Sequence, residues 1–155
     1  MEGKRSAGIL VFRRRPTGVE VLIGHMGGPF WIDRDARGWS IPKGEYEPDE
    51  APFDAARREF EEELGLPTPS GEFVALGTAT QRSGKVVTVW AVEGEIDPDD
   101  VLPGTFEMEW PRGSGRIQEF PEIDRVAWLD LEPARTKIVA AQEVFLDRLA
   151  DHLSA

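Results

Sequence analysis

The segment that most restricts how this chain can fold is residues 44–66, which read GEYEPDEAPFDAARREFEEELGL. Within it, residues 49–64 predict a helix: Asp49 suits the N-cap, Pro52 is tolerated in the first turn, and Gly65 suits the position just past the end. At about 100° per residue, four apolar side chains gather on one side of this helix, namely Phe53, Ala56, Phe60 and Leu64. We expect that side to pack against the core.

The rest of the chain reads as strands followed by a second helical region. β-Branched and aromatic content predicts strands at residues 7–12, 19–23, 72–81, 85–93, 105–110 and 125–130. Helical periodicity returns after Pro133 and is strongest over residues 138–153, where Val144, Phe145 and Leu149 can pack on the sheet. Without a repeat or an interdomain linker in the sequence, we expect residues 1–155 to form a single α/β domain.

Composition excludes several classes of protein. Hydrophobic residues make up 40% of the chain and charged residues 30%, as in ordinary globular domains. The absence of cysteine excludes a disulfide scaffold, a thiolate zinc site and a cysteine nucleophile. The apolar stretch 7–12 is too short for a signal peptide or a membrane span, so we expect a cytoplasmic protein with no membrane partner.

The net charge of −11 disfavours binding to a nucleic-acid polymer, which depends on Lys and Arg neutralising phosphates. A small anionic substrate stays compatible with this charge, because a bound divalent cation can reverse the local field.

The acidic residues of the 49–64 helix are unevenly spread. Glu59, Glu62 and Glu63 fall within an arc of roughly 100° beside the apolar stripe, whereas Glu61 points away from them. Carboxylates one turn apart repel one another unless a cation lies between them. Mg²⁺ prefers such hard oxygen ligands and commonly bridges carboxylates to substrate phosphates. The alternative interpretation is an acidic helix face that is simply solvated.

The spacing of residues 44–66 resembles the Nudix box, a motif of Nudix hydrolases. The positions that match by identity are Gly44, Glu50, Arg58, Glu59, Glu62, Glu63 and Gly65. At roughly 7% usage per residue type, chance agreement anywhere in the chain is about one in a million. Phe60 departs from the aliphatic residue of the motif, whereas Leu66 fits its final position.

The resemblance implies a fold, an activity and a set of site residues. The fold is the Nudix α/β/α sandwich, a mixed β-sheet flanked by helices. The activity is Mg²⁺-dependent hydrolysis of a diphosphate linkage, with Mn²⁺ as a substitute ion. The metal ligands implied are Glu59, Glu62 and Glu63, together with the carbonyl of Gly44. By the same resemblance Arg58 orients a glutamate, whereas Glu50 and Gly65 are structural.

A further acid is often contributed in this family by the loop before the last strand. Glu122 resembles that residue, and Glu119 is the alternative. The general base is either Glu59 or this loop acid.

The substrate must be inferred outside the box. Residues 39–44, WSIPKG, resemble the lead-in of Nudix enzymes that act on dinucleoside polyphosphates, diphosphoinositol polyphosphates or nucleoside triphosphates, and Lys43 can offer a charge to a phosphate. The proline typical of ADP-ribose pyrophosphatases is missing around Gln81, which disfavours that branch. We therefore expect a dinucleoside polyphosphate or a nucleoside triphosphate. A diphosphoinositol polyphosphate hydrolase and a non-catalytic nucleotide-binding module are the alternatives.

The sequence leaves two further questions open. The first concerns three tryptophans, which either stack on a base or pack in the core or at its rim: Trp31, Trp39 and Trp110. The two histidines, His25 and His152, are assigned no role. No dimer motif is evident, and a homodimer stays an open alternative.

Overall fold

A computed structural model describes residues 4–154. Its strands are β1 (Arg5–Arg15), β2 (Gly18–Met26), β3 (Trp39–Ser40), β4 (Lys43–Glu45), β5 (Val74–Thr80), β6 (Val86–Glu93), β7 (Thr105–Glu109), β8 (Ile117–Pro121) and β9 (Ile123–Asp130). Its helices are α1 (Pro52–Leu64), α2 (Leu131–Lys137) and α3 (Glu143–Ser154), with short 3₁₀ turns at Pro98–Asp100 and Ala140–Gln142.

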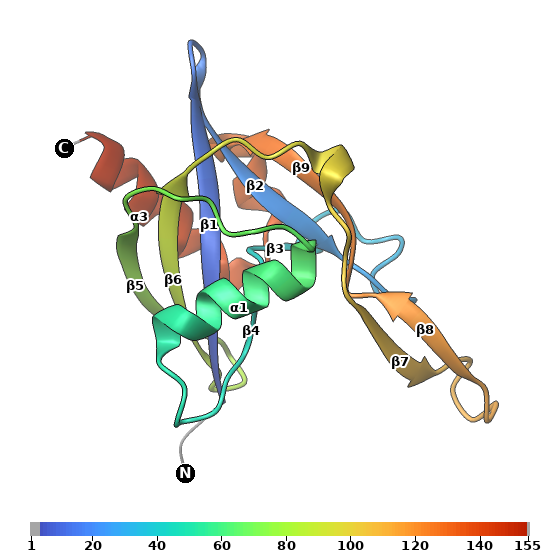
Figure 1. Cartoon of the computed structure of the whole chain (residues 1–155). Helices are drawn as coiled ribbons and strands as arrows, with labels where there is room; N and C mark the ends of the chain where they lie inside the picture. Colours follow the sequence, from blue (N-terminus) through green and yellow to red (C-terminus); the bar gives the residue numbers. More distant parts are fainter. Residues whose placement is uncertain (1–3, 155) are drawn as a thin grey trace.

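The main sheet is mixed and carries helices on both faces. Its strand order is β3-β2-β1-β6-β5, with β4 also paired to β1 and β9 to β2. Strands β1 and β6 run parallel, whereas the other named pairs in this sheet run antiparallel. Helix α1 lies across one face, and α3 covers the opposite face (Figure 1). The predicted α/β/α sandwich around a mixed sheet is therefore confirmed.

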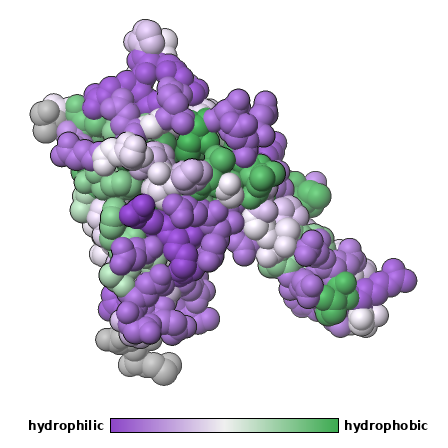
Figure 2. Space-filling view, viewed as in Figure 1, coloured by the Kyte–Doolittle hydropathy of each residue, from purple (hydrophilic) through white to green (hydrophobic). Residues whose placement is uncertain are grey.

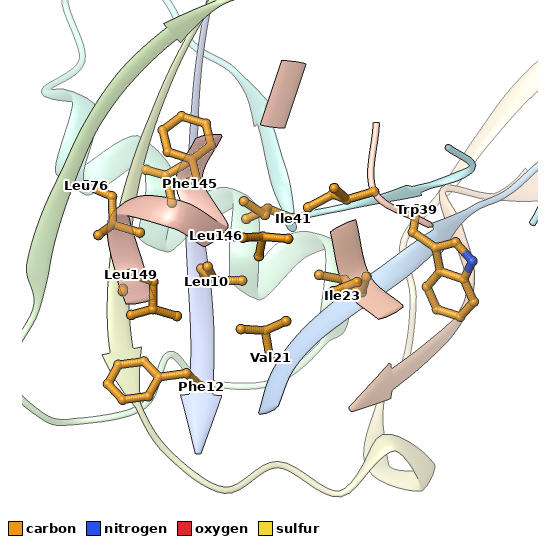
Figure 3. Packing of buried hydrophobic residues seen from close by; sticks show 14 of the residues in the cluster. Leu10, Phe12, Val21, Ile23, Trp39, Ile41, Leu76, Phe145, Leu146 and Leu149 are labelled. Atoms are coloured by element: carbon orange, nitrogen blue, oxygen red, sulfur yellow. The ribbon is translucent and has the colours of Figure 1, made fainter. Parts of the chain in front are cut away.

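Strand β1 is buried on both sides because the sheet has a core on each face. Side chains alternate along a strand, so Ile9 and Val11 join the cluster under α1, whereas Leu10 and Phe12 join the cluster under α3. Figure 3 shows Leu10 and Phe12 among the α3 residues of that second cluster, Phe145, Leu146 and Leu149. This double burial explains the nearly continuous apolar run at the start of the chain.

Strands β7 and β8 form a separate antiparallel hairpin that projects from the body of the molecule (Figure 1). In the same view, hydrophilic side chains cover the outward side of α1 (Figure 2). In the part of the chain from residue 4 to residue 154, no helix is both long and apolar enough to cross a membrane.

Two expectations about helix ends were wrong. Asp49 is not the N-cap of α1: Ala51 holds that position with Pro52 as the first helical residue, and no side chain caps the helix. The predicted helix over residues 138–153 begins only at Glu143. Residues 138 and 139 are extended because they bridge to Trp39, whose carbonyl accepts a 2.8 Å hydrogen bond from the Val139 N–H. This tertiary pairing overrides the helical periodicity.

Candidate active site

Helix α1 presents its acids to a cleft because its other face is committed to the core. Phe60 and Leu64 are fully buried, and so is Ala55. The chain leaves the helix through Gly65, whose φ of 67° is a left-handed conformation that glycine adopts without strain. Glu61 turns away, as expected, and accepts hydrogen bonds from the backbone and hydroxyl of Thr68.

The cleft has a volume of about 540 Å³ and lies between α1, β4, the loop after β2 and the turn before β9. Its acidic lining residues are Glu45, Glu59, Glu62, Glu63 and Glu122. The turn thus brings Glu122 to the helix glutamates, whereas Glu119 lies exposed in β8, opposite Glu107. Of the two loop acids weighed from the sequence, only Glu122 lines the cleft.

Gly44 and Glu59 are in close contact across the cleft wall. A Cβ atom built on Gly44 would lie 1.9 Å from Glu59 Oε2 and 2.1 Å from its Cδ. Any larger residue at position 44 would therefore have to displace this carboxylate. The glycine is needed here for space, so that the β4 backbone can lie against the side chain of Glu59.

Arg58 joins three glutamates of the motif. Its Nε and Nη2 donate to the two oxygens of Glu50 at 2.8 Å each, and its Nη1 donates to Glu59 Oε1 at 2.7 Å and to Glu62 at 3.3 Å. Hydrogen bonds from the guanidinium lower the pKa of Glu50. Glu50 anchors Arg58, and Arg58 in turn fixes one oxygen of Glu59.

The hollow on the other side of Arg58 is larger, about 730 Å³, and is lined by Lys4, Arg5, Tyr46, Glu50 and other residues. It contains none of the three helix glutamates implied as ligands. The larger of the two hollows is therefore not the candidate active site. The smaller cleft is, because it contains the three implied metal ligands.

A family model for the NUDIX domain matches residues 3–149. The chain belongs to the Nudix family.

One curated relative of this Nudix chain is an RNA pyrophosphohydrolase of Hahella chejuensis, 39% identical over 62 residues. The match covers 39% of this chain and 38% of that protein, so it spans well under half of either.

Solved structures show the same fold. The C. elegans Ap4A hydrolase, solved as a binary complex, superposes with a TM-score of 0.68 at 21% identity over 98% of each chain. The NUDIX domain of Shewanella oneidensis NrtR, solved with ADP ribose, superposes with a TM-score of 0.62 at 15% identity, covering 96% of this chain and 87% of that one.

Burial shapes the electrostatics of the Nudix cleft. It raises the pKa of Glu63 to about 8, with Glu122 and Glu59 adding to the rise and Lys43 opposing it. Burial also raises the pKa of Glu59 and, together with the charges of Glu59 and Glu62, that of Glu122, whose side chain stays partly exposed. The repulsion among these carboxylates is relieved when they bind either protons or a cation.

Lys43 contributes to the cleft mainly through its backbone. Its N–H donates to Glu63 Oε2 at 3.0 Å. Burial, with a smaller contribution from the nearby charge of Lys85, lowers the pKa of the Lys43 side chain. The side chain lines the cleft, where it can still meet a phosphate.

The donor set fits a hard divalent cation. It offers carboxylate oxygens from one helix face and a glycine whose missing Cβ leaves room beside Glu59. Within residues 4–154, however, no three acidic or histidine side chains form a ready-made ligand set. Arg58 Nη1 holds Glu59 Oε1, and the Lys43 N–H holds Glu63 Oε2.

The three candidate tryptophans have different surroundings. Trp39 is buried in the core, and Trp110 packs edge-on against Phe30 with ring centroids 5.3 Å apart. Trp31 lines the cleft, together with Phe106. From the sequence, Phe106 was predicted only as part of the strand at residues 105–110. The aromatic content of that strand was the one signal that could have pointed to Phe106.

We expect Glu63→Gln to change the pH dependence of stability in the metal-free protein. The folded pKa of Glu63, about 8, exceeds its ordinary value of 4.5. Stability from protonated Glu63 is therefore fully present below about pH 4.5 and is lost as the pH rises through about 8. In EDTA, the free energy of unfolding of the wild type should fall as the pH rises over this window. In Glu63→Gln most of this fall should be absent.

Denaturant unfolding between about pH 5 and pH 9 measures this effect. Glu61→Gln is the matched control, because it removes a carboxylate from the opposite side of the same helix. Parallel pH profiles for the wild type and Glu63→Gln would contradict the assignment.

Proposed function

We propose that this protein is a divalent-metal-dependent hydrolase that cleaves a diphosphate linkage in a nucleotide compound, either a dinucleoside polyphosphate or a nucleoside triphosphate. One observation carries the proposal: the helix glutamates, Glu122 and two aromatic side chains line the same cleft. Support also comes from the names of similar proteins, a pyrophosphohydrolase and an Ap4A hydrolase. The net charge of −11 favours a small substrate over an RNA polymer.

Glu59, Glu62 and Glu63, with the carbonyl of Gly44, would hold Mg²⁺, or Mn²⁺ in its place. A bound Mg²⁺ neutralises phosphate charge, orients the phosphates and acidifies water. Arg58 limits the motion of Glu59 by holding its Oε1 and leaves Oε2 facing Gly44. The glutamates thus enter the reaction in a fixed geometry.

Glu122 is the residue we assign as general base. It lines the cleft from the turn before β9, and its raised pKa makes the carboxylate a better proton acceptor near neutral pH. A carboxylate oxygen of Glu122 would take the proton of the water that attacks phosphorus. Glu59 suits this role less well, because Arg58 already occupies its Oε1.

The aromatic side of the cleft would receive the nucleoside. Trp31 and Phe106 come from segments far apart in the sequence and line the same cleft. Aromatic faces stack on bases of any identity. Lys43 also lines the cleft and would offer a charge to the phosphate chain.

Product release from a substrate panel tests the proposal. The panel contains dinucleoside polyphosphates, nucleoside triphosphates, ADP-ribose, a diphosphoinositol polyphosphate and a short 5′-triphosphorylated RNA, each with Mg²⁺, with Mn²⁺ and with EDTA. We expect turnover of a dinucleoside polyphosphate or a nucleoside triphosphate in either metal and none in EDTA. Binding of nucleotides without turnover in any metal would favour the non-catalytic module instead.

Arg58→Lys should lower kcat/KM about 10–100-fold, the loss expected from one or two charge-assisted hydrogen bonds. Lysine carries a single point charge and cannot bridge Glu50 and Glu59 at once. Arg57→Lys is the matched control, since Arg57 is the exposed neighbour on the same helix. Steady-state kinetics in saturating Mg²⁺ measures the effect, and an unchanged kcat/KM would remove Arg58 from the mechanism.

A further inference from the structure

His25 is a buried residue for which the proposed reaction has no direct use. It lies near the end of β2, and only 1% of its surface is exposed. Its Nδ1 lies 2.8 Å from Asp124 Oδ1, and its Nε2 lies 2.6 Å from the backbone carbonyl oxygen of Arg34. A carboxylate and a carbonyl both accept hydrogen bonds, so the two edges of the ring face two acceptors that belong to different segments of the chain.

The two partners of His25 belong to segments that carry cleft residues. Arg34 lies in the loop 27–38, and its N–H donates to the carbonyl of Trp31 at 2.9 Å, while its guanidinium lies 5.5 Å from the Trp31 ring. Asp124 lies in β9, two residues after Glu122. One buried ring thus connects the loop that carries Trp31 to the turn that carries the general base.

Both ends of this loop are packed without spare room. A Cβ on Gly27 would lie 1.9 Å from the carbonyl oxygen of Pro121, and the Gly27 N–H donates to the carbonyl of Glu122 at 2.9 Å. At the other end, a Cβ on Gly38 would lie 2.2 Å from the Arg34 carbonyl oxygen and 3.3 Å from His25 Nε2. The two glycines therefore let the loop lie close to residues 121–122 at one end and to the His25 ring at the other.

Neighbouring side chains hold the His25 ring and its two partners in place. On β9, Asp124 is in direct contact with the ring, and Arg125 lies with its guanidinium 5.1 Å from the Trp39 ring. On the loop, Arg34 turns its cation toward Trp31, and Asp35 is held by Lys137 and by the Trp39 indole N–H. Trp39 itself packs edge-on against the His25 ring, with ring centroids 5.3 Å apart.

We propose that His25 is a positioning residue: through its contacts with Arg34 and Asp124 it holds the loop 27–38 to the turn at residues 121–124 and so fixes Trp31 against the cleft. The proposal rests on the proposed function, because Trp31 is taken to contact the nucleoside. His25 does not line the cleft. Loss of the bridge should therefore weaken substrate binding more than it slows the chemical step.

The first test does not depend on activity. Hydrogen exchange of the backbone amides in residues 27–37 should become faster in His25→Gln and stay unchanged in His152→Gln, which alters the other, exposed histidine. Equal exchange in both variants would overturn the proposal.

The second test is a kinetic split. We expect His25→Gln to raise KM for the best nucleotide substrate about tenfold while kcat changes less than about threefold. Asp124→Asn serves as the milder variant, because the side chain keeps its shape while the carboxylate beside Nδ1 becomes an amide. It should raise KM in the same direction as His25→Gln, by a smaller factor.

The outcomes separate this inference from the proposed function. An equal fall in kcat and kcat/KM in His25→Gln, with KM unchanged, would contradict a positioning role. A wild-type protein without turnover in the substrate panel would overturn the proposed function, whereas the exchange results would still decide whether His25 holds the loop. If His25→Gln does not fold, Asp124→Asn carries the same exchange and KM measurements.

Discussion

Glu62→Gln is expected to lower kcat/KM for the best substrate of the panel by about 1,000-fold, which corresponds to roughly 4 kcal/mol of transition-state stabilisation. The side chain of Glu62 is 59% exposed, and its contact with Arg58 is a long one at 3.3 Å. The substitution should therefore leave the fold intact while removing one of the carboxylates proposed to hold Mg²⁺. Initial rates at several Mg²⁺ concentrations measure the loss.

Glu61→Gln is the control for this experiment, because it makes the same chemical change one position earlier. Glu61 faces away from the cleft and binds Thr68. It should retain kcat/KM within about twofold. Equal losses in the two variants would mean that the acidic helix acts through its overall charge and that the cleft carboxylates hold no ion.

Gly44→Ala is expected to lower kcat about 100-fold, although it adds a single methyl group. The new Cβ would lie 1.9 Å from Glu59 Oε2, so the carboxylate has to leave its position beside Arg58. Overpacking of this kind typically costs about 1–3 kcal/mol of stability. Kinetics and denaturant unfolding of the same preparation measure both effects.

The double variant Gly44→Ala/Glu59→Ala separates the steric cause from a general disturbance of β4. Truncating Glu59 removes the atoms that the new methyl group would strike. Stability lost in Gly44→Ala should be regained in the double variant relative to Glu59→Ala alone, whereas activity should not return. Additive losses of stability in the double variant would show that Gly44 and Glu59 are not coupled.

Local patterns in the sequence were enough to predict the acidic helix and its family. The apolar stripe of residues 53–64 depends on the period of an α-helix, so the buried Phe60 and Leu64 and the outward Glu61 follow from spacing alone. The strands were predicted from their β-branched and aromatic content, which is also a local property, and most strands of the sheet overlap the predicted ranges. The match of Gly44 to Gly65 with the Nudix box is likewise a property of one continuous segment.

Short elements escaped prediction because their pairing partners are distant in the chain. Strands β3 and β4 contain two and three residues, too few to show a period, and they exist through their contacts with β2 and β1. Likewise Val139 is extended because it bonds to Trp39, a residue one hundred positions earlier in the chain.

The sequence by itself determined which residues could carry the chemistry: the glutamates of one helix face, their arginine and a glycine at a fixed distance along the chain. Only the tertiary structure decided which residues join them. It placed Glu122 in the cleft and Glu119 outside it, selected Trp31 from three tryptophans, and brought His25 between Arg34 and Asp124. The physical reason is that helical and strand periods are local, whereas these contacts join segments whose proximity depends on how the whole sheet packs.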